Sequence, residues 1–213
     1  MERLTKDNNM DYLFAVVLFA ISSSVTPGPN NIMVMTSGLN FGVRKSLSLL
    51  TGICVGFTVM LLLVGLGFSQ LFEEFPNLHF IIKCVGVFYL LYLAYLIAGS
   101  ADDVHSDKQS EPFSFVKGLL FQWVNAKAWV VATGAIAAFT TTEANFLSQN
   151  IMIATIFFVV SFPCVGVWLV FGSILKNVLN SSKSRRWFNF TMSGLLVLSV
   201  VPVVGEIFHK ILS

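Results

Sequence analysis

Charged residues are scarce in this chain. Only 11% of its 213 residues are Asp, Glu, Lys or Arg, whereas 55% are hydrophobic. Soluble domains carry about 25% charged residues, so this composition excludes an ordinary soluble domain and indicates an integral membrane protein. The formal net charge is only +2, and the basic residues are dispersed along the chain. Nothing in this pattern points to nucleic-acid binding.

Cysteine and histidine are also scarce, with three of each. The cysteines lie singly in apolar runs, and their spacing forms neither a CxxC pair nor a metal site. The histidines are far apart in sequence, at the ends of hydrophobic segments or in a polar stretch. A metalloenzyme needs clustered ligands, and a serine protease needs a serine–histidine pair within the membrane. We therefore expect no enzymatic activity and no bound metal.

Six hydrophobic segments approach the length that spans a bilayer, which predicts an all-α polytopic membrane protein. They are residues 11–36, 46–70, 78–98, 115–140, 149–172 and 187–209. The first segment turns polar after Ile21, and its apolar part is too short to cross the bilayer alone. A re-entrant hairpin followed by five true spans is therefore the alternative to six spans.

A polar stretch, residues 99–114, divides this single membrane domain into two halves, residues 1–98 and 115–213. Each half contains three predicted spans. Because three is an odd number, two similar halves would lie inverted in the membrane, as in many secondary transporters. The inversion follows from counting spans, since the two halves show no clear sequence repeat.

The basic residues predict how the chain is oriented. With six spans, eight basic residues fall on one side of the membrane and four on the other. The eight are Arg44, Lys45, Lys108, Lys117, Lys176, Lys183, Arg185 and Arg186, and the four are Arg3, Lys6, Lys83 and Lys210. The richer side is expected to be cytoplasmic, which places both termini in the periplasm.

The run Thr26-Pro27-Gly28-Pro29-Asn30-Asn31 interrupts the first hydrophobic segment. Two prolines and a glycine cannot continue a helix. In lipid, a break survives only when it is buried in protein or lines a wet cavity, and broken helices mark substrate sites in secondary transporters. The alternative is a proline kink without function.

A helix that starts again after this break offers a binding site for a carboxylate. Its free N–H groups and positive dipole end would point into the membrane interior. Asn30 and Asn31 add amide donors and acceptors beside them. The carbonyls freed by the break at residues 26–30 could accept hydrogen bonds from an ammonium group. An amino acid carries both groups.

Gln122, Asn125 and Lys127 are the polar candidates of the fourth segment. A lysine about twelve residues from either end of a span is too deep to reach the interface easily, so it is a functional candidate. Its alternative role is a structural partner of carbonyls or of a carboxylate. Gln122 and Asn125 share one helical face with Gly118, Trp129 and Thr133, which predicts that this face points inward. Lys127 lies about 200° from Asn125 on an unbroken helix, so it faces another neighbour unless the helix is distorted there.

Two GxxxG pairs, Gly38 with Gly42 and Gly52 with Gly56, predict close helix packing. The pattern does not distinguish packing within one subunit from packing in a homo-oligomer.

These motifs together resemble the LysE/RhtB family of amino acid exporters. The resemblance rests on residues 24–32, on Gly38, on residues 42–47 and 52–56, and on the segment Phe115–Lys127, and it covers nearly the whole chain. Residues 121–127 most resemble the branch that exports cysteine and O-acetylserine. Ala126 stands where many members of the family have proline, which leaves open whether the fourth helix also breaks.

The resemblance implies proton-driven export of amino acids or their derivatives across a bacterial inner membrane, with no cofactor. A passive amino acid channel or facilitator is the alternative function. The predicted substrate site comprises Thr26, Pro27, Gly28, Pro29, Asn30, Asn31, Gln122, Asn125 and Lys127.

Overall fold

The computed structural model describes residues 2–68, 74, 76–99, 111–141, 146–179 and 181–212. These residues form helices joined by short connections. In chain order the elements are α1 (Glu2–Val25), α2 (Pro29–Phe41), α3 (Val43–Leu63), η1 (Val64–Phe68), α5 (Pro76–Gly99), α6 (Phe115–Phe121), η3 (Gln122–Val124), α7 (Ala126–Phe139), α8 (Phe146–Val178) and α9 (Ser182–Leu212). The prediction of an all-helical fold is confirmed for this described part of the chain.

Four helical stretches are long and apolar enough to cross a membrane. They are Val43–Gly67, Phe80–Gly99, Phe146–Lys176 and Ser182–His209. The bent pair α1 and α2 makes a fifth if it is counted as one span. The predicted span at 115–140 is divided into two shorter apolar helices, Phe115–Val124 and Ala126–Phe139. The chain is thus a multi-pass membrane protein, while the count of six and the inversion of the halves stay predictions.

Glycines bring the helices of the two predicted halves into close contact. α2 packs on α8 where Gly38 faces the Leu169 backbone and Gly172 faces the Met35 backbone, so closely that a Cβ at either glycine would collide. α6 packs on α3 in the same way, since a Cβ on Gly56 would lie 2.7 Å from the Leu119 carbonyl oxygen. Small residues that let helix backbones approach are the usual basis of helix packing in lipid.

The GxxxG prediction is thereby resolved for three of its four glycines. Gly38, Gly52 and Gly56 pack against other helices of the same chain. Gly42 does not, because it forms the one-residue turn between α2 and α3 with φ +80°. That left-handed conformation is the reason for a glycine there. The homo-oligomer considered from these motifs stays a prediction.

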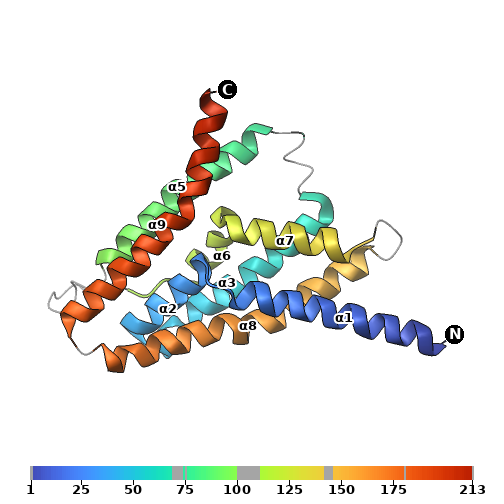
Figure 1. The fold of residues 1–213 in the computed structure, drawn as a ribbon, viewed down its shortest axis with the longest axis horizontal. Helices are drawn as coiled ribbons and strands as arrows, with labels where there is room; N and C mark the ends of the chain where they lie inside the picture. The colour runs from blue at the N-terminus through green and yellow to red at the C-terminus, as the bar shows by residue number, and fades with distance from the viewer. Residues whose placement is uncertain are drawn as a thin grey trace.

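α5 and α9 form a separate pair. Figure 1 shows them side by side and inclined away from the group that contains α1, α2, α3, α7 and α8. They touch that group chiefly where α5 meets η3 and α9 meets α2. One contact between α2 and α9 is polar, since the Asn189 side-chain amide donates to Asn40 Oδ1 at 3.4 Å. The apolar core still continues into this pair, since one core cluster joins buried residues of α5 and α9, such as Leu93 and Leu196, to those of α2, α3 and α8.

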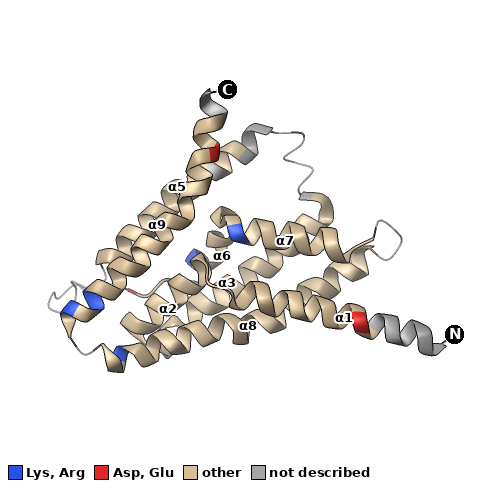
Figure 2. Ribbon diagram, in the orientation of Figure 1, with Lys and Arg blue, Asp and Glu red and all other residues tan. Residues whose placement is uncertain are grey.

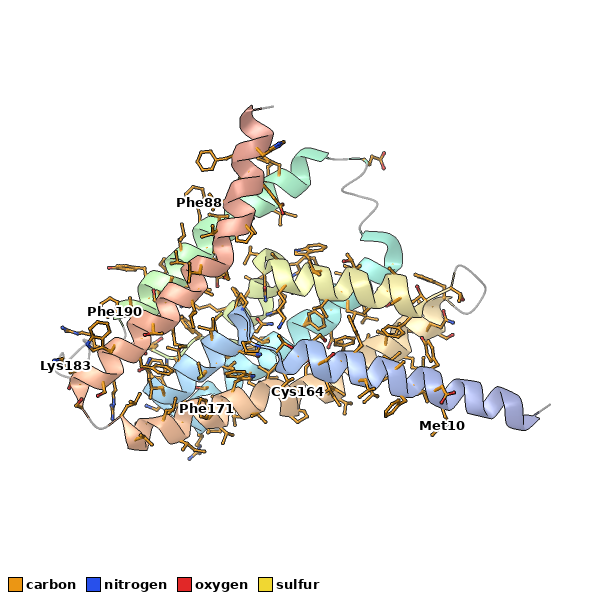
Figure 3. All side chains as sticks on the ribbon, viewed as in Figure 1. Met10, Phe88, Cys164, Phe171, Lys183 and Phe190 are labelled. Atoms are coloured by element: carbon orange, nitrogen blue, oxygen red, sulfur yellow. The ribbon has the colours of Figure 1, made fainter. Side chains whose placement is uncertain are left out.

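The outer surface is apolar, as a bilayer requires. Phe88 on α5, Phe190 on α9 and Phe171 on α8, which are labelled in Figure 3, are all exposed, and Phe88 is 74% exposed. Charged side chains concentrate elsewhere. In Figure 2, basic residues gather where α8 ends and α9 begins, the region of Lys176 and Lys183. This cluster is part of the basic side that we predict to be cytoplasmic.

Candidate functional site

The first helix break lies between Val25, the last residue of α1, and Pro29, the first residue of α2. The two helices meet at a bend of 56°, and residues 26–28 are not helical. Gly28 has φ −175° and ψ 179°, an extended conformation open to any residue. Its lack of a side chain matters for another reason, because a Cβ there would lie 2.9 Å from Cδ of Lys127. A side chain at this position would therefore have to displace the Lys127 stem.

The last carbonyls of α1 have lost their helical partners at this break, and side chains from three other segments replace them. Asn31 in α2 donates its Nδ2 to the carbonyls of Ser24 (3.1 Å) and Thr26 (2.9 Å). Trp168 in α8 donates its Nε1 to the Val25 carbonyl at 3.0 Å.

The third donor is Lys127 in α7. Its Nζ donates to the carbonyl of Thr26 at 2.6 Å and lies 3.5 Å from that of Pro27. A cation at the carboxyl end of a helix also suits the negative end of the helix dipole.

The start of α2, unlike the end of α1, has no side chain that caps its backbone groups. Pro29 occupies its first turn and has no N–H, and Gly28 at the N-cap position brings no capping side chain. The first helical hydrogen bond runs from the Ile32 N–H to the Gly28 carbonyl at 3.0 Å. The N–H groups of Asn30 and Asn31 precede it and so have no partner within the helix. They are the donors that an anion could use.

The second break lies between α6 and α7. The helix tightens into the short 3₁₀ segment η3, and Asn125 then adopts an extended conformation with φ −87° and ψ 104°. Asn125 Oδ1 accepts a hydrogen bond from the Lys127 N–H at 3.2 Å and so caps the start of α7. The question left open by Ala126 is answered: this helix breaks without a proline, because Asn125 caps the new helix from its own side chain.

This break explains how Asn125 and Lys127 reach the same place. On a continuous helix they would point in nearly opposite directions, but both line the same cavity here. The interior face predicted for this segment is only partly correct. Gly118, Gln122 and Asn125 are buried, whereas Thr133 is exposed because α7 does not continue the α6 helix.

Two amide side chains join the breaks to each other. Asn30 Nδ2 donates to Gln122 Oε1 at 2.9 Å, and Gln122 Nε2 donates to Asn30 Oδ1 at 3.0 Å. Gln122 Nε2 also donates to the Gly118 carbonyl at 3.0 Å, and its side chain is fully buried. The pair is mutually satisfied, so we assign it to holding the two breaks in register rather than to direct contact with a ligand.

A cavity of about 50 Å³ lies between the breaks. This is room for more than one water molecule, since a single water needs roughly 10–15 Å³. Its walls combine polar groups of both breaks with apolar side chains of α3, α7 and α8. The lining residues are Ser23, Ser24, Gly28, Asn30, Asn31, Ile53, Cys54, Phe57, Asn125, Lys127, Ala128, Val131, Phe157, Ser161 and Val165.

Five of the nine predicted site residues line this cavity: Gly28, Asn30, Asn31, Asn125 and Lys127. Thr26 and Pro27 contribute carbonyls to Lys127, Pro29 begins α2, and Gln122 supports Asn30 from behind. Sequence reasoning missed the apolar wall and the three serines. A serine run directly before a helix break was the available signal for Ser23 and Ser24, whereas nothing in the sequence near Ser161 marked it.

The electrostatics of the cavity are simple. Lys127 is half-buried and is the one charged side chain among the described lining residues. In the described part of the chain, no three His, Cys, Asp or Glu side chains gather as metal ligands would. The site thus offers a cation and helix amides to a negative group, and backbone carbonyls to a positive one.

A known protein family and several known proteins match this chain over most of its length. The family described as LysE type translocator matches residues 21–203. The cysteine/O-acetylserine efflux proteins of Escherichia coli K12, Shigella sonnei strain Ss046 and Shigella flexneri are each 27% identical over 192 residues, which is 90% of this chain and 96% of theirs. No solved structure gives a significant match. The family match covers most of the chain, including both breaks and the cavity between them, and the chain therefore belongs to the LysE type translocator family.

Proposed function

We propose that this protein exports small amino acids of the cysteine and O-acetylserine type across the bacterial inner membrane, driven by the proton gradient. The similarity to cysteine/O-acetylserine efflux proteins supports the substrate class. The observation that carries the site is the uncapped start of α2, which lines the same cavity as Lys127 at the first break. A helix amino terminus beside a lysine is a suitable binding site for the carboxylate of an amino acid.

The cavity also supports a restriction to small uncharged side chains. Phe57, Phe157 and Val131 form apolar walls, and the neighbouring serines add hydroxyl groups. Lys127 would repel a second cation in such a confined space. We therefore expect lysine and arginine to be poor substrates.

Uptake into everted membrane vesicles tests this function directly. Vesicles that contain the protein should accumulate radiolabelled cysteine or O-acetylserine against a gradient, and a protonophore should abolish the accumulation. A passive channel would equilibrate the substrate but would not concentrate it, with or without the protonophore. Failure to move any member of a panel of amino acids would reject the proposal.

The predicted orientation has its own test. The basic cluster at the α8–α9 connection supports a cytoplasmic location for that connection and a periplasmic location for both termini. A reporter fused after residue 105 should report the cytoplasm, and one fused at the carboxyl terminus should report the periplasm. A cytoplasmic carboxyl terminus would contradict six spans and favour five.

A further inference from the structure

We propose that Lys127 occupies the ammonium subsite of the transport cavity, and that the ammonium group of an amino acid displaces it on binding. This inference rests on the proposed function and specifies how its site works. The Lys127 Nζ lies where the carbonyls of Thr26 and Pro27 converge, at the carboxyl end of α1. The lysine head is thus an internal substitute for the substrate.

The chemistry of the two ammonium groups supports the exchange. The lysine ε-ammonium and the α-ammonium of an amino acid are both compact cations that offer three N–H donors. The subsite presents carbonyl acceptors at the negative end of a helix dipole, which suits either group. An exchange leaves the carbonyls of the break satisfied throughout, so it avoids the cost of uncovering them in the membrane interior.

The position of Lys127 allows it to move. Its side chain is half-buried and lines the cavity, and the Lys stem carries its head on a flexible chain. The absence of a side chain at Gly28 leaves room for that stem, since a Cβ there would lie 2.9 Å from Cδ and 3.3 Å from Nζ. Once released, the Lys127 head can pair with the substrate carboxylate at the start of α2.

Charge balance then explains why a zwitterion is required. A zwitterion adds no net charge to a cavity that already holds Lys127. An amine alone would add a second cation, which is costly at short range in a medium of low dielectric constant. A carboxylate alone would draw Lys127 away, which leaves the Pro27 carbonyl without its lysine donor and the Thr26 carbonyl with Asn31 as its remaining donor. The cavity should therefore select ligands that carry both groups.

The first arm of the test uses the purified protein and two isomers. O-acetyl-L-serine and N-acetyl-L-serine have the same composition, but only the first has a free ammonium group. In mildly acidic buffer, which prevents acyl migration, O-acetyl-L-serine should raise the melting temperature of the unmodified protein by about 2–4 °C at saturation. N-acetyl-L-serine should not raise it. Equal stabilisation by both isomers would overturn the ammonium subsite.

The second arm replaces Lys127 with alanine and adds the missing part of the lysine side chain as a free amine. Lys127→Ala lacks the equivalent of n-propylammonium, so n-propylammonium chloride should raise its melting temperature saturably, and should leave the unmodified protein unchanged. Lys117→Ala is the matched control, because Lys117 is an exposed lysine whose Nζ lies over the Phe113 ring at 5.5 Å. If Lys127→Ala does not fold, Lys127→Met takes its place with ammonium chloride as the probe, because Met keeps the bulk of the stem and lacks only the ammonium group.

The outcomes separate the two proposals. A Lys127 variant that gains nothing from n-propylammonium would show that the carbonyls of Thr26 and Pro27 do not bind a free ammonium group, which overturns the exchange, while stabilisation by O-acetyl-L-serine would leave the exporter proposal intact. Rescue by n-propylammonium supports the subsite even if no amino acid of the panel stabilises the protein, and in that case the proposed substrate class fails instead.

Discussion

The two helix breaks of this protein are made by different means. At the first, prolines and a glycine prevent the helix from continuing, and the freed carbonyls depend on donors from α2, α7 and α8. At the second, no proline is present, and Asn125 caps the new helix from its own side chain. The first break therefore depends on the rest of the protein, whereas the second is largely self-sufficient.

This difference assigns different roles to the two breaks. A break that is capped by its own side chain leaves few free backbone hydrogen-bonding groups for a ligand, but it fixes the direction of the neighbouring side chains. The second break directs Lys127 and Gln122 toward the first break, where one reaches the carbonyls of α1 and the other reaches Asn30. The first break retains the uncapped start of α2. We infer that the first break binds the substrate and that the second positions the groups that serve it.

The largest effect is expected at Gly28, because a side chain there would fill the space between the breaks. Gly28→Leu should abolish export, by at least about 100-fold, while membrane insertion remains normal; a loss of that size corresponds to roughly 2.7 kcal/mol. Transport assays with quantified membrane protein would measure it. Gly194→Leu is the control, since Gly194 is exposed on α9 with nothing near its Cβ position. Full export by Gly28→Leu would remove the first break from the mechanism.

A smaller but still severe effect is expected at Lys127, the main contribution of the second break to the first. Lys127→Met keeps most of the bulk and removes the charge, so we expect it to stop uphill export. Lys127→Arg keeps the charge but changes the shape and hydrogen bonding, so we expect it to retain export in part at best. Everted vesicles would give both rates. Wild-type, protonophore-sensitive export by Lys127→Met would make the lysine purely structural.

The amide pair should contribute a moderate amount to stability. Asn30→Ala leaves the buried Gln122 amide without its partner, and Gln122→Ala does the same to the half-buried Asn30 amide, whereas the double variant removes both. A double-mutant cycle on thermal unfolding should therefore give a coupling energy of about 1–2 kcal/mol. The matched cycle on Asn40 and Asn189, whose contact is longer at 3.4 Å, should give less. No coupling between Asn30 and Gln122 would show that the breaks are held together by other contacts.

The smallest effect is expected for Ala126→Pro, which makes the second break more like the first. Ala126 is the first residue of α7, where proline fits, and Asn125 already has the extended conformation that precedes a proline. We expect export to remain and the free energy of unfolding to rise by about 0.4–1 kcal/mol. A large destabilisation would mean that position 126 needs its N–H group or cannot hold the proline ring.

The sequence predicted the first break well because prolines act locally, whatever surrounds them. It left the second break open because Asn125 acts through a cap, and an asparagine in an apolar run does not by itself show whether it caps a helix. The inward face drawn through Thr133 was wrong for the same reason. That prediction assumed one continuous helix. In the structure the extended residue Asn125 separates α6 and η3 from α7, so the residues of α7 do not continue the faces of α6.

The partners of the α1 carbonyls could not be predicted. Trp168 lies 143 residues from Val25, and Lys127 lies 101 residues from Thr26. Such contacts depend on how the helices pack, which the glycines of α2, α3, α6 and α8 determine in three dimensions. Sequence reasoning therefore identified most of the polar groups of the site but neither their pairing nor the apolar wall of the cavity.

Substrate binding to the purified protein tests most directly the claim that the first break is the binding site. Equilibrium binding of radiolabelled O-acetyl-L-serine should be measured in lipid nanodiscs for the unmodified protein, Gly28→Leu and Gly194→Leu. The account predicts saturable binding to the unmodified protein and to Gly194→Leu, and none to Gly28→Leu. Equal binding by all three proteins would contradict it and place the substrate elsewhere.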